Sequence, residues 1–120
     1  MSYFQRNLAR HGKPVVIEDR DLKLINGQSR EVFSNPRDDI GLIKTLEGVS
    51  VFDNTNTERV ATHRICLDYR DDVGAEQWLK LNGTNKRVKI LTAENKCENN
   101  EVLILMCTER GEDSKIVNSG

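Results

Sequence analysis

The side chains that could do acid–base chemistry in this sequence are few, and their spacing does not join them into a site. His63 lies in a segment whose alternating pattern predicts a strand, on the face that points inward with Ile65 and Leu67. A catalytic base needs a nucleophile or an oriented carboxylate within reach. The spacing predicts neither beside His63, so we expect it to be a structural histidine.

Two pairs of adjacent carboxylates are the next candidates, Asp38-Asp39 and Asp71-Asp72. Adjacent residues of an extended chain point in opposite directions, so neither pair is suited to share a proton or a metal ion. We predict that both pairs lie in solvated turns. The sequence also has no glycine-rich phosphate-binding loop of the dinucleotide or Walker type. We therefore expect no catalytic residue, no metal and no other cofactor.

The cysteines indicate a reduced protein. Cys66, Cys97 and Cys107 are an odd number, at spacings of 31 and 10 positions. These spacings match neither a disulfide framework nor a paired zinc motif. We expect three free thiols in or near the core. Because the first residues also have no apolar signal region, we expect the protein to be made and kept in the cytoplasm.

A hairpin face with one tryptophan and three cations is a candidate contact surface. In the hairpin predicted around Asn82-Gly83, Trp78 and Arg87 are cross-strand neighbours, and Lys80 and Lys89 lie on the same face. An indole beside cations could stack on a base of single-stranded nucleic acid, or contact a protein. The alternative is a solvated outer face braced by one aromatic side chain.

Composition limits both the fold and the classes of partner. The chain has 120 residues, of which 37% are hydrophobic, and this suits one domain with a modest core. Its 18 basic residues nearly balance its 19 acidic residues, so the net charge of −1 gives no overall field to hold a polyanion. The longest apolar run, residues 102–107, is far shorter than the roughly 20 residues of a membrane-spanning helix. We expect one domain over residues 1–111, a flexible tail at 112–120, and no membrane partner.

The alternation of apolar and polar residues predicts a mainly β chain. A short helix with a capping box is expected over residues 2–11, ended by Gly12, and the clearest strand covers residues 61–70. Further strands are expected at 15–17, 22–25, 40–46, 49–52, 77–81, 84–92 and 101–108, with a loop or a frayed hairpin at 28–39. Many short strands and one helix indicate a small closed or nearly closed antiparallel barrel.

Two Asn-Gly pairs predict hairpin turns, at Asn26-Gly27 and Asn82-Gly83. A two-residue turn at the second pair would place Leu79 opposite Lys86. It also puts one set of apolar side chains on a common face: Leu79, Leu81, Val88 and Ile90. We predict that the core includes Ile65, Leu67, Val88, Leu103 and Leu105. The run that begins at Asp53 contains no apolar residue, so we predict a loop that no group in the free domain holds in place.

Several of these segments occur together, in a fixed order, in one known family. The matching pieces are Ile43-Lys44-Thr45, Gly48-Val49-Ser50-Val51-Phe52-Asp53, Asn54-Thr55-Asn56-Thr57-Glu58, Thr62-His63-Arg64, Asp68-Tyr69-Arg70, Trp78, Asn82-Gly83, Lys89-Ile90-Leu91, Glu94-Asn95 and Leu103-Ile104-Leu105-Met106-Cys107-Thr108-Glu109-Arg110-Gly111. On these residues the segment 40–111 resembles the head-closure, or head–tail joining, proteins of long-tailed bacteriophages and their prophage relatives.

The resemblance implies a small antiparallel β-barrel, SH3-like or related, with a long internal loop and no enzymatic activity. It implies a structural component of the virion neck, present in the host bacterial cytoplasm during assembly. Copies would form a ring, dodecameric in the virion, below the portal or head–tail adaptor protein. The ring would close the DNA-filled head and offer a docking surface to the tail terminator or another tail protein. Packaged DNA would pass through without specific binding, in agreement with the near-zero net charge.

The resemblance also implies that the polar loop makes the partner contacts. Its residues are Asp53, Asn54, Thr55, Asn56, Thr57, Glu58 and Arg59. The face with Trp78, Lys80, Arg87 and Lys89 would be a secondary contact surface. The alternative function is a small barrel that binds single-stranded nucleic acid through Trp78 and the basic hairpin face.

Overall fold

A computed structural model describes residues 3–53, 55–81, 86–98 and 100–109. It is mainly β, with one short helix at the N-terminal end, as the sequence predicts. The elements in chain order are α1 (Tyr3–His11), β1 (Lys13–Ile25), β2 (Gln28–Phe52), β3 (Glu58–Asp68), β4 (Trp78–Leu81), β5 (Arg87–Asn95), the 3-10 turn η1 (Lys96–Glu98) and β6 (Val102–Glu109). Strands of very unequal length are the first departure from the expected pattern of many short ones.

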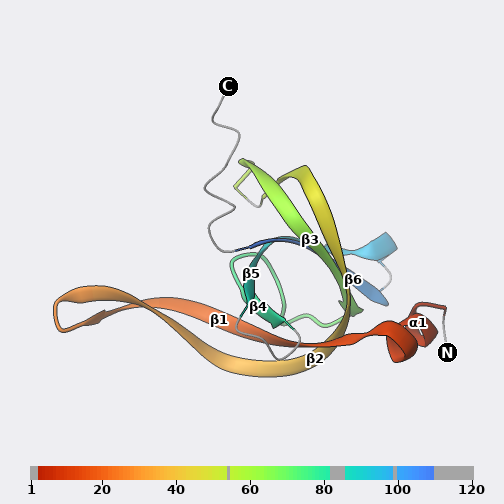
Figure 1. Cartoon of the computed structure of the whole chain (residues 1–120), viewed down its shortest axis with the longest axis horizontal. Helices are drawn as coiled ribbons and strands as arrows, with labels where there is room; N and C mark the ends of the chain where they lie inside the picture. The colour runs from red at the N-terminus through yellow and green to blue at the C-terminus, as the bar shows by residue number, and fades with distance from the viewer. Residues whose placement is uncertain (1–2, 54, 82–85, 99, 110–120) are drawn as a thin grey trace.

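The six strands form one antiparallel sheet that closes in a ring (Figure 1). The strand order is β1-β2-β3-β6-β5-β4, and β4 returns to β1, with Val15 opposite Leu81. Closure leaves no free edge within the ring, which protects its backbone from pairing with other chains. The predicted fold class is confirmed. The molecule is not a plain barrel, because β1 and β2 continue together far beyond the ring (Figure 1).

The predicted helix is present and ends where glycine was expected to end it. The Gly12 N–H donates to the Leu8 carbonyl oxygen at 2.9 Å. A Cβ on residue 12 would collide with the Ile40 side chain and with that same carbonyl oxygen. Only glycine fits this close approach. The predicted capping box involves Ser2, which lies outside the described residues.

Residues 28–39 form a strand, so the prediction of a loop there is wrong and the hairpin alternative is the correct one. They belong to β2 and pair with β1 all the way to the turn at Asn26 and Gly27, whose φ values are 52° and 78°. Positive φ at both positions is what a type I′ turn requires. Pro36 lies where the register shifts between Ile17 and Asp19. Ladder hydrogen bonds are interrupted at a bulge, so a residue without an N–H is tolerated there.

The break predicted near Glu47-Gly48 is absent, and the loop predicted at residues 53–59 is two residues shorter than expected. β2 continues through Gly48, with only a register irregularity between Thr45 and Val49. Residues 53–57 alone separate β2 from β3. The polar stretches misled the prediction because a paired ribbon with solvent on both faces does not need alternating hydrophobic residues.

The predicted hairpin of β4 and β5 has the right faces and the wrong register. Trp78 lies opposite Lys89, Leu79 opposite Val88, and Lys80 opposite Arg87. The register is shifted by two residues from the prediction, so residues 82–85 lie between the paired positions; they are outside the described residues. A shift of two preserves the alternation, and the predicted apolar face, with Leu79 and Val88, is buried.

The core fills the inside of the ring. All five predicted core residues are buried: Ile65, Leu67, Val88, Leu103 and Leu105. They pack with Val15, Ile17, Val73, Leu79, Leu81, Ile90 and Cys107. Strand β6 pairs with β3 on one side and with β5 on the other. No helix in the described part of the chain is long and apolar enough to span a membrane. The predicted tail at 112–120 lies outside the described residues.

Leu105→Ala tests this core. Leu105 is fully buried, so truncation should lower the free energy of unfolding by roughly 2–5 kcal/mol, measured by urea denaturation. The matched control is Ile104→Ala, because its half-buried side chain points to the outer face of the same strand. Equal losses from the two variants would contradict the assignment of faces in β6.

Candidate functional site

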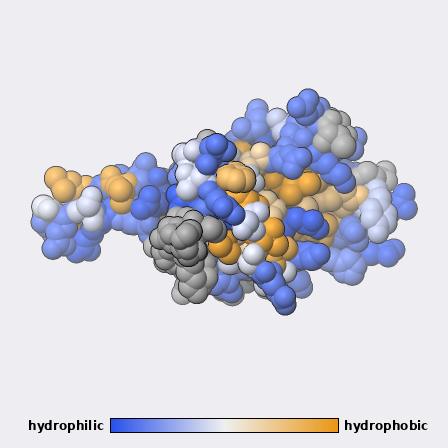
Figure 2. Space-filling view, turned by 90° about the horizontal axis from the view of Figure 1, so that it is seen from above, coloured by the Kyte–Doolittle hydropathy of each residue, from blue (hydrophilic) through white to orange (hydrophobic). Residues whose placement is uncertain are grey.

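The most prominent feature outside the core is a two-stranded ribbon, here called the arm, made of residues 19–25 of β1 and 28–34 of β2. It leaves the ring on the left of Figure 1 and points away from α1, which lies at the opposite end of the molecule. Figure 2 shows apolar side chains on its surface near the tip. They belong to Leu22, Leu24 and Ile25, and Leu24 is 77% exposed. The sequence predicted the strand and turn here but not that these side chains stay in solvent.

A polar cluster at the base of the arm fixes its direction. Arg37 pairs with Asp19 at 3.2 Å and with Asp72 at 3.1 Å, joining the two strands to the turn before β4. Asn35 donates to Asp19 at 3.1 Å, and Gln77 donates to it at 2.9 Å. Hydrogen bonds from Asn35 and then Arg37 lower the pKa of Asp19 below its usual value. The arm is therefore tied to the ring at its base.

One carboxylate of each predicted pair, Asp39 and Asp72, forms an ion pair with an arginine. Asp38 and Asp39 lie in β2, so the prediction of a turn there is wrong; Asp71 and Asp72 do lie in a turn. Arg70 pairs with Asp39 at 2.9 Å and with Asp72 at 2.7 Å. Its hydrogen bonds lower the pKa of the Asp72 carboxyl, and Asp72 in turn raises the pKa of Arg70. This arginine links β2 to the turn that precedes β4.

Trp78 is buried, so the hypothesis of an exposed stacking platform at this residue is wrong. Only 7% of its surface is exposed. The Phe33 ring from the arm base packs edge-on against it, with 5.7 Å between centroids and 77° between planes. The Arg87 guanidinium lies 4.1 Å above the Phe33 ring centroid and pairs with Glu18 at 2.9 Å. The predicted pairing of Trp78 with Arg87 is replaced by this cluster, whose members come from the four strands β1, β2, β4 and β5.

The two lysines of the predicted secondary contact face stay near the surface. Lys89 lies directly opposite Trp78 and pairs with Glu76 at 3.7 Å. Lys80 lies opposite both Val16 and Arg87. Both lysines are half-buried. The four residues are thus close in space, but the arm covers the aromatic member that nucleic-acid stacking would need.

Phe33→Ala tests whether the arm base shields Trp78. Since Trp78 is the single tryptophan of the chain, its fluorescence reports this contact directly, and we expect the emission maximum to move to longer wavelength. The free energy of unfolding should fall by roughly 1–3 kcal/mol, less than for a core phenylalanine. Leu22→Ala, on the same face but near the tip, is the control and should change neither quantity. An unchanged emission spectrum in Phe33→Ala would refute the shielding.

His63 and the described thiols behave as structural groups. His63 is buried, as predicted; its Nδ1 hydrogen-bonds Thr62 Oγ1 at 2.9 Å, and its Nε2 lies 3.9 Å from a Glu109 oxygen. Desolvation lowers the pKa of His63, and it raises the pKa of both Cys66 and Cys107. These two cysteines are free thiols, as expected. The side chain of Cys97 lies outside the described residues.

The predicted contact loop is a tight turn organised by Asp53. One carboxylate oxygen accepts from the Thr55 N–H at 2.9 Å, the Thr55 hydroxyl at 2.6 Å and the Thr57 N–H at 3.0 Å. The other accepts from Arg59 at 3.0 Å. The Thr55 hydroxyl contributes most to lowering the pKa of Asp53 far below its usual range. The expectation that no group holds this segment in place is therefore wrong, because the Asp53 carboxylate holds it through these hydrogen bonds.

This turn joins two strands at the top of Figure 1, away from the arm. Glu58 and Arg59 are the first residues of β3 rather than loop residues, and Asn54 lies outside the described residues. Two apolar side chains near the end of β2, Val49 and Phe52, are exposed beside the turn. The sequence analysis did not predict these exposed apolar side chains, because it considered only the polar residues that follow them. The turn and its border form a second projecting surface.

Asp53→Asn should destabilise the turn in a pH-dependent way. A carboxyl whose pKa is depressed in the folded state stabilises it above the unfolded-state pKa of about 3.9, and the contribution disappears as the pH falls through the folded-state value. At neutral pH we expect a loss of roughly 1–3 kcal/mol, as for hydrogen bonds to a charged group. The difference from wild type should shrink below about pH 4, measured by urea unfolding across pH. Glu58→Gln is the control, and a pH-independent difference for Asp53→Asn would contradict the role of the charge.

Among the described residues, no group of three or more histidine, cysteine, aspartate or glutamate side chains is arranged to hold a metal ion. The site that emerges is a pair of projecting surfaces, the arm and the Asp53 turn, on one rigid ring. Comparison of the chain with known protein families and with curated proteins finds no match.

Proposed function

We propose that this protein is a structural component of a bacteriophage neck. It binds below the portal or adaptor ring, closes the DNA-filled head and offers a docking surface to the tail. It acts as a ring of copies, dodecameric in the virion, with a tail terminator or other tail protein as its second partner. It is present in the host cytoplasm during assembly and in the virion neck afterwards. The proposal carries over what the resemblance of residues 40–111 implies.

One observation carries the proposal: a closed ring of strands sends out two separate surfaces with exposed apolar residues. The arm bears Leu22 and Leu24, and the Asp53 turn is bordered by Val49 and Phe52. A subunit that must contact its neighbours and also the structures above and below it needs several such surfaces on one rigid scaffold. The near-zero net charge supports the same function, because a channel that lets DNA pass should not bind it tightly.

The alternative function, binding of single-stranded nucleic acid through Trp78, has less support. Stacking requires an indole face open to solvent. Here Phe33 packs on Trp78, and the neighbouring Arg87 is paired with Glu18. The neck function is therefore the one that the geometry favours.

Replacing residues 54–57 with a Gly/Ser linker of equal length tests the proposal. Asp53 is kept, and folding is checked by thermal melting. We expect a folded variant that, in place of the wild-type gene, gives heads that leak DNA or carry no tails. The matched control replaces residues 96–98, a turn between β5 and β6, in the same way and should give normal virions. Normal yields of tailed, DNA-filled particles from the 54–57 variant would exclude this turn as the partner contact.

A further inference from the structure

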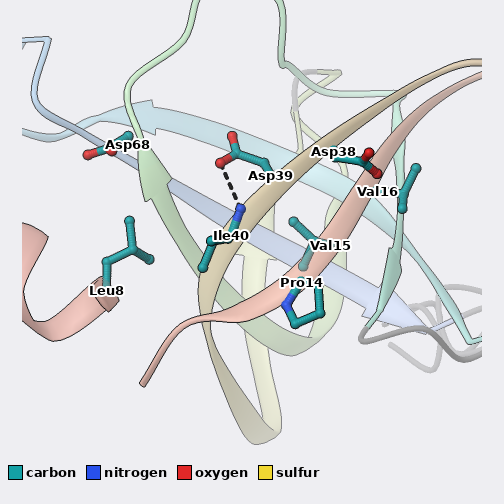
Figure 3. Close-up of a pocket in the computed structure, with 8 residues that line it drawn as sticks. All are labelled: Leu8, Pro14, Val15, Val16, Asp38, Asp39, Ile40 and Asp68. Carbon is teal, nitrogen blue, oxygen red and sulfur yellow. Dashed lines mark hydrogen bonds between the residues drawn. The ribbon is translucent and has the colours of Figure 1, made fainter. Parts of the chain in front are cut away.

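A groove at the opposite end of the molecule from the arm tip is a candidate binding site. It has a volume of about 610 Å³ and lies between α1 and the neighbouring stretches of β1 and β2. Figure 3 shows Leu8 and Ile40 pointing into the same space, with Pro14 beside them. Ile40 is 49% exposed. The groove thus has apolar walls that nothing in the described chain covers.

The charges that line this groove are all negative. They are Asp38, Asp39 and Asp68, and no cation is among the lining residues (Figure 3). Asp39 is paired with Arg70. Within the described ranges, Asp38 and Asp68 form no ion pair. An occupant with apolar side chains and one or two cations would complement both properties of the groove.

The arm tip has those two properties. Leu22 and Leu24 are two residues apart on one strand, so they lie on the same face of the ribbon, and both are largely exposed. Lys23 and Arg30 lie directly opposite each other on the other face. Like charges in this position repel, and neither enters an ion pair in the part of the chain that the structure describes. Carboxylates of a partner would relieve that repulsion.

The tip cannot reach the groove of its own chain. The arm is a continuously paired ribbon held at its base by Arg37 and Asp19, and it points away from α1 (Figure 1). Tip and groove therefore lie at opposite ends of the molecule, whose longest dimension is 51 Å. Two different surfaces that complement each other on one chain give a head-to-tail contact between copies, which continues until a ring closes or a filament forms.

We propose that the arm tip of one copy docks in the groove between α1, β1 and β2 of the next copy. Leu22 and Leu24 cover Leu8 and Ile40, while Lys23 and Arg30 lie near the carboxylates of the rim. The closing of this series into a ring rests on the proposed neck function; the contact itself does not. A tip of this size buries much less than the roughly 1,200–2,000 Å² of a stable interface, so a single contact is weak and forms at high local concentration.

Complementary variants of the full-length protein test the contact. Leu22→Asp/Leu24→Asp disables the tip and keeps the groove, and Ile40→Asp disables the groove and keeps the tip. Analytical ultracentrifugation up to about 1 mM covers weak contacts. Wild type should show masses that rise beyond a dimer with concentration. Each variant alone should remain monomeric, and an equal mixture should stop at a dimer, because only one tip and one groove remain.

A matched control and a second measurement guard against misfolding. Ala93→Asp places a charge on an exposed apolar residue of β5, outside both projecting surfaces, and should associate as wild type does. Photoreactive benzoylphenylalanine at position 24 should cross-link to peptides containing Leu8, Pro14 or Ile40 of another copy. Wild type that stays monomeric, variants that associate like wild type, or cross-links to other surfaces would overturn the proposal.

The two proposals can fail separately. The ultracentrifugation uses no phage component, whereas the replacement of residues 54–57 is assayed in virions. Docking with normal virions from the 54–57 variant would refute the contact role of the turn and leave the copy-to-copy contact standing. Tailless heads from the 54–57 variant without any tip-to-groove cross-link would refute the copy-to-copy contact and leave the contact role of the turn standing.

Discussion

The long ladder between β1 and β2 is the interaction on which the other features depend. Its first part, from Lys13 to Ile17, belongs to the ring, where β1 also pairs with β4 and closes the sheet. Its second part, beyond the bulge at Asp19, is the arm. The same two strands are packed on the core in the ring and extend into the arm. The packed part therefore holds together a ribbon that has no core of its own. An isolated two-stranded hairpin is only marginally stable in water, so the arm needs this continuity.

The bulge between the two parts sets the direction of the arm, and polar contacts hold it there. Asp19 receives hydrogen bonds from three side chains, two on β2 and one in the turn before β4, and Phe33 packs on Trp78. Bulges bend a strand and increase its local twist. Here the bend is fixed by contacts that bring together β1, β2 and the turn before β4. A fixed direction reduces the ordering cost of binding, because the arm is already in one conformation before a partner arrives.

The elements that the sequence predicts correctly are those whose side chains divide between a core and solvent. The alternation from Ala61 to Leu67 identified β3 and its inward face, and Asn26-Gly27 identified the turn of the arm. For residues 28–39 the sequence left a loop and a frayed hairpin both open, because no residue there is fully buried and no hydrophobic period appears. The burial of Trp78 escaped prediction for another reason: its cover, Phe33, comes from a distant part of the chain. Local patterns contain no information about such long-range contacts.

The candidate surfaces were partly predictable for the same physical reason. Composition identified the segment at Asp53 as polar and exposed, but it could not show that one carboxylate organises the turn or that Phe52 borders it. An aspartate that accepts several backbone and hydroxyl hydrogen bonds makes a turn rigid without any apolar contact. Both projecting surfaces are thus pre-ordered, one by a ladder and the other by a single carboxylate. Contacts between rigid, pre-ordered surfaces form with little further loss of conformational entropy, so even small surfaces such as these can contribute to association when several of them act together.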